Sequence, residues 1–249
     1  ALYGETPVYT FTPQECSQIA SVLVDGVEVT SELVGSLTSG ATYTFDPVDT
    51  AHNISVTFEV ITYVLSTIYS GTGFGYCVPE QDTVECNETV LYTINAGTGS
   101  YIESYTITND MGTNFVDMSG FHSASFSFNI DNITSHTTVK VVFNRFQKNV
   151  TVVNAGGNGT ICCDTTVLYG DSCIVRVDAD AAAGYHIDYI TDGTDTTYYT
   201  TGDVTAEYRV YDIINDVTIT AAFAINEYRI VTLFTPEGYA TAVPADTLV

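Results

Sequence analysis

The sequence contains no tryptophan, only two methionines, and six Lys and Arg residues against thirty Asp and Glu. A net charge of −24 repels a phosphate backbone and an anionic lipid surface, so we expect no nucleic-acid partner. No apolar run approaches the roughly 20 residues that a membrane helix needs, which argues against direct membrane insertion. The chain start lacks the basic and apolar regions of a signal peptide, as expected for mature secreted material or a part of a longer chain.

The residues that are abundant favour strands. Eighteen tyrosines and twelve phenylalanines accompany many Val, Ile and Thr residues, whereas the usual helix-forming surface residues are scarce. Hydrophobic residues make up 45% of the chain, which is enough to bury a core despite the acidic surface. The composition therefore predicts an all-β protein.

Six cysteines occur without paired CxxC motifs, which disfavours a zinc site and favours disulfides of an oxidising, extracellular compartment. We predict two bridges, Cys77–Cys86 and Cys163–Cys173, because their separations of 9 and 10 residues (86 − 77 and 173 − 163) fall at matching places in a repeated sequence. The cysteines left over are Cys16 and one of the adjacent pair Cys162 and Cys163. They can bond to each other, to another chain, or not at all.

An internal repeat of about 83 residues is the main organising feature of the sequence. Phe45, Phe128 and Val210 hold the same place in three copies and lie 83 and 82 residues apart, so the 249 residues amount to three periods. Apolar and mainly polar residues alternate in the blocks around them, as in strands with one face in a core. The three copies of the closing block are Ile54 to Phe58, Val139 to Phe143 and Val217 to Phe223.

One of the three copies is divided between the two ends of the chain. The opening segment Leu2-Tyr3-Gly4-Glu5-Thr6 matches Leu168-Tyr169-Gly170-Asp171-Ser172, and Val243-Pro244 near the C-terminus matches Val78-Pro79. The sequence therefore predicts all-β tandem small domains, β-grasp-like or sandwich repeats, one of them split between the termini. The predicted parts are 1–62 (second part of the split repeat), 63–146 (second repeat), 147–225 (third repeat) and 226–249 (first part of the split repeat).

The third repeat shows a more specific pattern of glycine-rich turns and short strands. Its elements are Gly156-Gly157, Gly170-Asp171-Ser172, Gly184-Tyr185-His186-Ile187, Asp192-Gly193 and Val217 to Phe223. This pattern resembles the divergent internalin B-type repeats of bacterial and archaeal surface proteins. The resemblance implies tandem small β-domains that form stalks and adhesins outside the cell. Residues 63–146 depart most from it, with Asn109-Asp110-Met111-Gly112 where Asp-Gly is expected.

Candidate chemical sites are few. The acid pairs Asp178/Asp180 and Asp192/Asp195 offer oxygens of the kind that calcium prefers, but neither forms an EF-hand loop. We therefore expect turn carboxylates and no cofactor, with calcium as the alternative. The four histidines are scattered, and no set of residues points to catalysis, so we expect a protein that is not an enzyme. Tyrosines around Tyr198 favour cross-strand packing, with a glycan-binding platform as the alternative.

Five Asn-X-Ser/Thr sequons occur, which suits a glycosylated surface protein. The predicted acceptors are Asn53, Asn87, Asn132, Asn149 and Asn158. The hypothesis that best unites these features is an extracellular structural protein that forms a filament, sheath or coat by head-to-tail strand complementation. The alternatives are an adhesin stalk or glycan-binding module, a continuous longer chain built of such units, and a closed monomer whose own ends meet.

Overall fold

Short strands, in which apolar and polar residues alternate, fold into pairs of facing sheets. This confirms the all-β prediction. The computed structural model describes residues 1–162, 166–231 and 246–248. These residues contain no α-helix, so of the two predicted architectures the sandwich applies to them. The chain divides into two units, 1–144 and 145–249. None of the described helical segments is long and apolar enough to cross a membrane.

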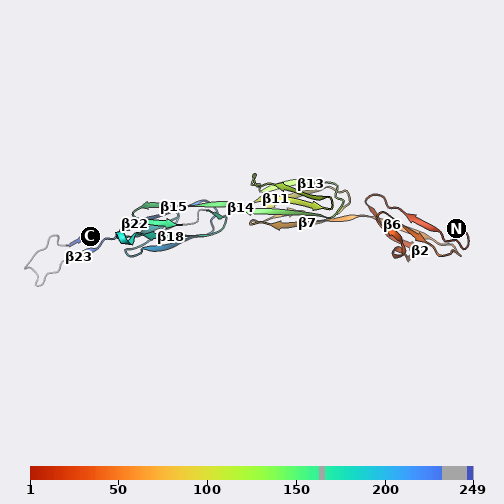
Figure 1. Cartoon of the computed structure of the whole chain (residues 1–249), viewed down its shortest axis with the longest axis horizontal. Coiled ribbons are helices and arrows are strands. Elements are labelled where there is room, and N and C mark those ends of the chain that lie inside the picture. The colour runs from red at the N-terminus through yellow and green to blue at the C-terminus, as the bar shows by residue number, and fades with distance from the viewer. Residues whose placement is uncertain (163–165, 232–245, 249) are drawn as a thin grey trace, which may run out of the picture. The chain divides into compact units, whose positions relative to one another are not determined.

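The second repeat is a sandwich of a five-stranded sheet and a three-stranded sheet, ordered β12-β11-β14-β7-β9 and β13-β10-β8. Its strands β7, β11, β13 and β14 are labelled in Figure 1. Its first and last strands, β7 and β14, are parallel neighbours at the centre of the larger sheet. Thirteen buried residues from both sheets form one core. The strands are β7 (Thr62–Ser70), β8 (Gly75–Val78), β9 (Gln81–Glu85), β10 (Val90–Ala96), β11 (Ser100–Asn109), β12 (Gly112–Asp117), β13 (Ser125–Ile130) and β14 (Thr137–Arg145).

The third repeat has the same topology, with sheets ordered β20-β19-β22-β15-β17 and β21-β18-β16. Its first and last strands, β15 and β22, are again parallel and central, and ten buried residues form the core. A short 3₁₀ turn, η2 (Ala181–Ala183), precedes β19. The strands are β15 (Gln147–Gly156), β16 (Gly159–Cys162), β17 (Thr166–Leu168), β18 (Cys173–Ala179), β19 (Tyr185–Thr191), β20 (Thr196–Tyr198), β21 (Thr205–Val210) and β22 (Val217–Ile225).

The N-terminal part of the first unit contains the later strands of this topology and one additional edge strand, β4. It has two three-stranded sheets, β3-β2-β6 and β1-β5-β4. The sheet β3-β2-β6 corresponds to β20-β19-β22 of the third repeat, without the counterparts of β15 and β17. Only four residues are buried in its core. Its elements are β1 (Val8–Phe11), β2 (Ser17–Val24), β3 (Val27–Glu28), the 3₁₀ turn η1 (Thr30–Glu32), β4 (Val34–Ser36), β5 (Gly40–Thr44) and β6 (Ile54–Val60).

Local irregularities support this structural correspondence between repeats. A β-bulge follows Ile19 opposite β6, and another follows Ile187 opposite β22. Phe58 pairs with Ile19 in the first case, and Phe223 pairs with Ile187 in the second. Because a bulge shifts the facing of every later residue, its recurrence aligns the two sheets residue by residue.

The C-terminal residues that the structure describes form a separate hairpin of β23 (Arg229–Val231) and β24 (Asp246–Leu248). The hairpin has the antiparallel pairing of β7 with β9 and of β15 with β17. The strands that the N-terminal part lacks are thus of the kind that the C-terminal hairpin supplies. Within the predicted part 226–249, residues 232–245 and 249 lie outside the described residues, Val243 and Pro244 among them.

Candidate functional site

The last strand of the N-terminal part, β6, has an open edge. Among the described residues it pairs with β2 alone, whereas β14 and β22 are each flanked by a parallel first strand. Phe58 of β6 is 44% exposed, while its counterparts Phe143 and Phe223 are 1% and 5% exposed. An aromatic side chain of this size stabilises a fold chiefly by being buried. The open edge therefore leaves Phe58 without the neighbouring strand that would cover it.

The facing sheet is open at the corresponding place. Tyr9 of β1 is 45% exposed, although its counterparts Tyr92 and Val175 are fully buried. Two hollows of about 230 and 310 Å³ border these open strands, one beside Tyr9 and Ile54 and the other beside Phe58. We call the open edges of β1 and β6, with the hollows beside them, the open groove.

Glycine-rich turns close the same place in the complete repeats. A Cβ atom on Gly71 or Gly75 would lie 2.0 or 2.4 Å from the nearest atom of Phe143. A Cβ atom on Gly157 would likewise lie 2.1 Å from the carbonyl oxygen of Phe223. Only glycine permits so close an approach, and the turn then covers the aromatic ring. The matching glycine expected from the sequence, in 232–245, lies outside the described residues.

The C-terminal hairpin exposes apolar side chains that complete repeats bury. Ile230 lies seven residues after Phe223, as Leu65 lies seven after Phe58 and Val150 seven after Phe143. Leu65 and Val150 are 0% and 4% exposed, whereas Ile230 is 53% exposed. The chain therefore presents an unfilled groove near one end and an uncovered strand near the other.

All three copies contain a turn of the same geometry. In the complete repeats it follows β9 and β17, the strands whose counterpart the N-terminal part lacks. Its backbone closes through Gly4 N to Val48 O, 2.8 Å, and Val48 N to Glu5 O, 2.9 Å. In the second repeat, Asn87 N donates to Ile133 O at 2.9 Å and Ile133 N donates to Glu88 O at 3.1 Å. In the third repeat, Gly170 N donates to Ile213 O and Ile213 N donates to Asp171 O, both at 2.9 Å. These bonds align Val48 with Ile133 and Ile213, so Phe45 matches Ile130 and Val210, and the predicted match of Phe45 with Phe128 is wrong. The N-terminal segment is thus already folded as the middle of a repeat.

The prediction of a Cys77–Cys86 bridge is wrong, because Cys86 is bonded to Cys16. Cys16 adopts a left-handed backbone with φ of 64°, in the place that Gly99 and Gly184 occupy in the other repeats. The bridge joins the N-terminal part to the second repeat within the first unit, with 5.3 Å between the Cα atoms. A disulfide of this kind is typical of oxidising compartments.

Cys77 lies in the core of the second repeat. The alternation of β8 points its side chain inward, where it is 3% exposed and burial raises the pKa of its thiol. Its backbone N–H donates to the hydroxyl of Tyr69 at 2.9 Å, and burial raises the pKa of that tyrosine to about 12. The spacing argument failed because it matched Cys77 with Cys163, whereas the register of β8 and β16 matches it with Ile161.

The other predicted bridge involves a residue outside the described part of the chain. Cys163 is such a residue, so the Cys163–Cys173 bridge stays a prediction, and Cys173 is buried at the start of β18. Cys162 is exposed at the end of β16 and carries a free thiol in the part of the chain that the structure describes.

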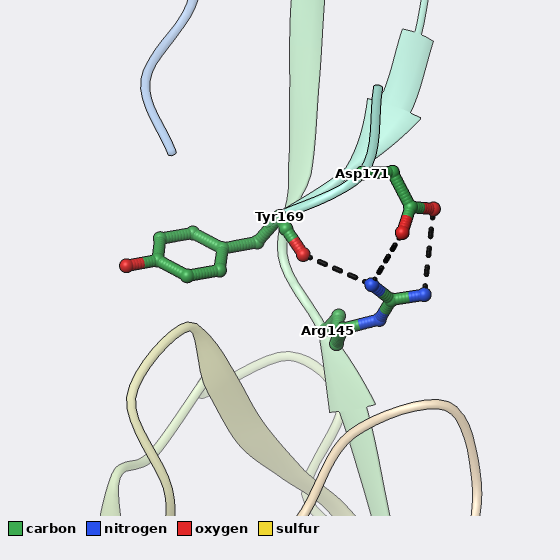
Figure 2. A network of polar contacts seen from close by, with 3 residues as sticks. All are labelled: Arg145, Tyr169 and Asp171. Atoms are coloured by element: carbon green, nitrogen blue, oxygen red, sulfur yellow. Dashed lines mark hydrogen bonds and ion pairs between the residues drawn. The ribbon is translucent and has the colours of Figure 1, made fainter. Parts of the chain in front are cut away.

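In the third repeat, an ion pair between Arg145 and Asp171 stabilises the turn at Gly170 and Asp171 (Figure 2). Arg145 donates from Nη1 to a carboxylate oxygen of Asp171 at 2.7 Å and to the carbonyl oxygen of Tyr169 at 3.0 Å, while Nη2 reaches the other Asp171 oxygen at 3.4 Å. A bidentate contact of this kind fixes the orientation of the guanidinium group and also pairs the two opposite charges. Asp171 holds the place of Glu88 in the second repeat and of Glu5 in the split one.

The predicted glycosylation acceptors are all on the surface. The exposed side chains are Asn53, Asn87, Asn132, Asn149 and Asn158. Asn53 lies beside the open edge at the start of β6. Asn87 also donates to the sulfur of Cys16 at 3.0 Å, next to the disulfide. Exposure is what a glycan requires, and occupancy stays a prediction.

Asp180 and Asp192 act as turn residues, whereas Asp178 lies within strand β18, so the expectation of a turn carboxylate is wrong for Asp178. Asp192 Oδ1 accepts from the backbone N–H groups of Thr194 and Asp195 at 2.8 and 2.7 Å, and Asp180 accepts from Ala183 N at 3.1 Å. Within the described ranges no group of three or more acidic, His or Cys side chains is placed to hold a metal ion. The calcium alternative has no assembled ligand set in these residues.

The histidines and the tyrosine pair lie apart from one another. His52 Nδ1 is 2.6 Å from a carboxylate oxygen of Asp25, at the mouth of the open groove, and His136 Nδ1 accepts from Val64 N at 2.9 Å. The rings of Tyr189 and Tyr198 lie 6.2 Å apart across neighbouring strands, with Tyr198 75% exposed. Cross-strand packing describes this pair, and its outer ring remains accessible.

Acid is expected to destabilise the third repeat. The backbone hydrogen bond from Asp195 holds the pKa of Asp192 below its usual range, and the bonds from Thr200 and Asn149 do the same for Asp203 and Asp216. A carboxyl group whose folded pKa is depressed contributes stability above its unfolded pKa and loses it as pH falls through the folded one.

Urea unfolding followed by circular dichroism should therefore show constant stability from pH 7 to 5 and a fall below about pH 4. Asp192→Asn should flatten part of that fall, with Asp178→Asn as the exposed control. An unchanged urea midpoint at pH 3 would contradict the assignment.

No protein-family model matches the chain, and no curated protein matches it. Among solved structures, the Bacillus anthracis TIE protein aligns with 87% of this chain and 67% of its own, at 8% sequence identity and a TM-score of 0.21. That similarity is too low to define a fold relationship or to assign a function.

Proposed function

We propose that the chain is an extracellular structural repeat protein that assembles head to tail into a filament, sheath or coat. The observation that carries the proposal is the exposed Phe58 in an otherwise repeated sandwich. In a head-to-tail assembly, the C-terminal hairpin of one copy completes the open groove of the next. The added strand pairs with the backbone edge of β6 while Ile230 enters the core.

The parallel ladders of the complete repeats set the expected register. Leu65 faces Thr137, and Val150 faces Val217. The same register places Ile230 opposite His52 of the neighbouring copy and Val231 opposite Asn53. Ser66 and Thr138, which hold the places of Val231 and Asn53, lie 3.2 Å apart through their hydroxyl oxygens.

The charge and the cysteines fit such an assembly outside the cell. A net charge of −24 repels copies from one another, so backbone pairing and buried apolar area must supply the attraction. The disulfide and the exposed sequons suit an oxidising, glycosylating environment. The proposal assigns the chain neither a catalytic step nor a cofactor.

Ile230→Asp should abolish assembly without unfolding the chain, because Ile230 is 53% exposed in the single copy. Loss of a buried isoleucine alone weakens association roughly a hundredfold, and burying a carboxylate adds to that loss. Sedimentation velocity and electron microscopy of the wild-type protein should show fibres that the variant lacks. Phe115→Asp, at a position 63% exposed on the edge strand β12, is the matched control.

Wild-type protein that sediments as a monomer at physiological salt would overturn the proposal. Fibres of Ile230→Asp that match those of wild type would overturn the role of the hairpin. If the native material is a continuous longer polypeptide, its intact mass will exceed 26.9 kDa and the same junctions will lie within one chain.

The accessible face of Tyr198 favours one second function, a glycan-binding stalk or adhesin module. Exposed aromatic rings stack on sugars, and the ring is 75% exposed beside Tyr189. Binding of the monomeric protein to a glycan array, lost in Tyr198→Ala, would favour this function over assembly.

A further inference from the structure

The residue that follows the closing strand β6 forms backbone hydrogen bonds to two consecutive repeats, and we call this arrangement the clamp. In the first unit this residue is Ile61. Its N–H donates to the carbonyl oxygen of Cys16 at 2.9 Å, and its own carbonyl oxygen accepts from Cys86 N at 2.9 Å. The Cys16–Cys86 disulfide spans the same place. Ile61 is therefore held on one side by the repeat it leaves and on the other by the repeat it enters.

The second unit contains the two halves of this clamp at its two ends. Phe146 holds the place of Ile61 at the entry to the third repeat, and its carbonyl oxygen accepts from Tyr169 N at 2.8 Å. Asn226 holds that place at the exit, and its N–H donates to the carbonyl oxygen of Gly184 at 2.8 Å. Gly184 and Cys16 share a left-handed backbone, with φ of 84° and 64°.

The partner that would complete the clamp at Asn226 is found in the N-terminal segment. Tyr3 holds the place of Cys86 and Tyr169, in the turn whose backbone bonds are common to all three copies. Its side chain is 87% exposed. The side-chain amide oxygen of Asn226 is buried and has no hydrogen-bond partner in the described part of the chain.

Resting on the proposed head-to-tail assembly, we propose that Tyr3 of a second copy docks against Asn226 and Gly184, reproducing the Cys86–Ile61–Cys16 junction. The Tyr3 N–H then donates to the carbonyl oxygen of Asn226. Gly184 and Tyr3 stand where the cysteines stand in the first junction, so the junction between copies is non-covalent. Ile225 stands where Arg145 stands, opposite Glu5 of the second copy.

Transplanting the native disulfide tests this geometry. In a Cys162→Ser background, which removes the exposed free thiol, the double variant Tyr3→Cys/Gly184→Cys should form a ladder of disulfide-linked oligomers on a non-reducing gel after mild oxidation, and dithiothreitol should collapse it. Each single variant should fail to give the ladder. Tyr211→Cys/Gly184→Cys is the matched control, because Tyr211 is also an exposed tyrosine, at 69%. Circular dichroism shows whether the variants are folded.

A second variant avoids any change at a left-handed residue. Ile225→Arg, at a position 59% exposed, should pair with Glu5 of the next copy as Arg145 pairs with Asp171. Association should tighten roughly two- to fivefold at low salt, with the gain removed by high salt or by Glu5→Gln. An unchanged association constant at low salt would count against the junction.

The outcomes separate the two proposals. Fibres in the microscope without the specific ladder overturn the clamp and leave head-to-tail assembly standing. A protein with neither fibres nor ladder overturns both. A ladder confined to the Tyr3→Cys/Gly184→Cys pair supports both.

Discussion

Phe143→Ala should lower the free energy of unfolding of the second repeat by about 3–5 kcal/mol, because it empties a fully packed core position. Phe58→Ala, the same substitution at the corresponding place, should cost only about 1 kcal/mol in the monomeric protein, since its ring is already 44% exposed. Urea denaturation, with hydrogen exchange to assign each transition to a repeat, measures both losses. The contrast between identical substitutions isolates the effect of the missing strands.

Assembly should remove that contrast. Once a second copy covers the open groove, Phe58 becomes a core residue, and Phe58→Ala should then weaken the fibres much as Phe143→Ala weakens the second repeat. Equal losses for the two variants in the monomer would mean that Phe58 is already covered, and the open groove would not exist in solution.

Loss of the Cys16–Cys86 disulfide should lower the stability of the N-terminal part by about 4 kcal/mol, the loop-closure value for its sequence separation of 70 residues. The effect falls on this part because its core has only four buried residues. Cys16→Ser/Cys86→Ser should expose amides in β2 and β6 to rapid hydrogen exchange while amides of the third repeat stay protected.

Cys162→Ser provides the control for this experiment, since that thiol is exposed and outside the bridge. It should leave every transition in place. Protection of β2 and β6 that survives in the double serine variant would show that the N-terminal part is stable without the covalent link.

The strands were predictable because their residues alternate. The closing blocks ending at Phe58, Phe143 and Phe223 are all strands, and their apolar residues face a core in the two complete repeats. Alternation reports a strand and its buried face directly. The division of the larger fold into sheets of five and three strands was not predictable, because partner choice depends on contacts far apart in sequence.

The disulfide was mispredicted for a related reason. Cys77 and Cys86 are close in sequence, but β8 and β9 belong to different sheets, and the inward-facing Cys77 is sealed in the core. The signal for the true partner was Cys16 at the place of Gly99 and Gly184. A cysteine where the repeat otherwise requires a left-handed glycine indicates a special role, and only an alignment guided by backbone angles shows it.

The open groove could be located from the periodicity but not characterised by it. The match of Leu2 to Thr6 with Leu168 to Ser172 indicated that the chain begins in the middle of a repeat, so that the first strands of that repeat are missing from the N-terminal part. The exposed fraction of Phe58 and the volumes of the hollows needed coordinates, because burial depends on which strands surround a residue.

The parallel pairing of first and last strands determines how a repeat resists mechanical force. When tension is applied through the two ends of the second repeat, it pulls β7 and β14 in opposite directions along their length. Their ladder bonds run across that direction, so all of them are sheared together and none can be unzipped singly. The same holds for β15 and β22. A fibre joined by β23 and β6 would bear load at its subunit boundaries through the same arrangement.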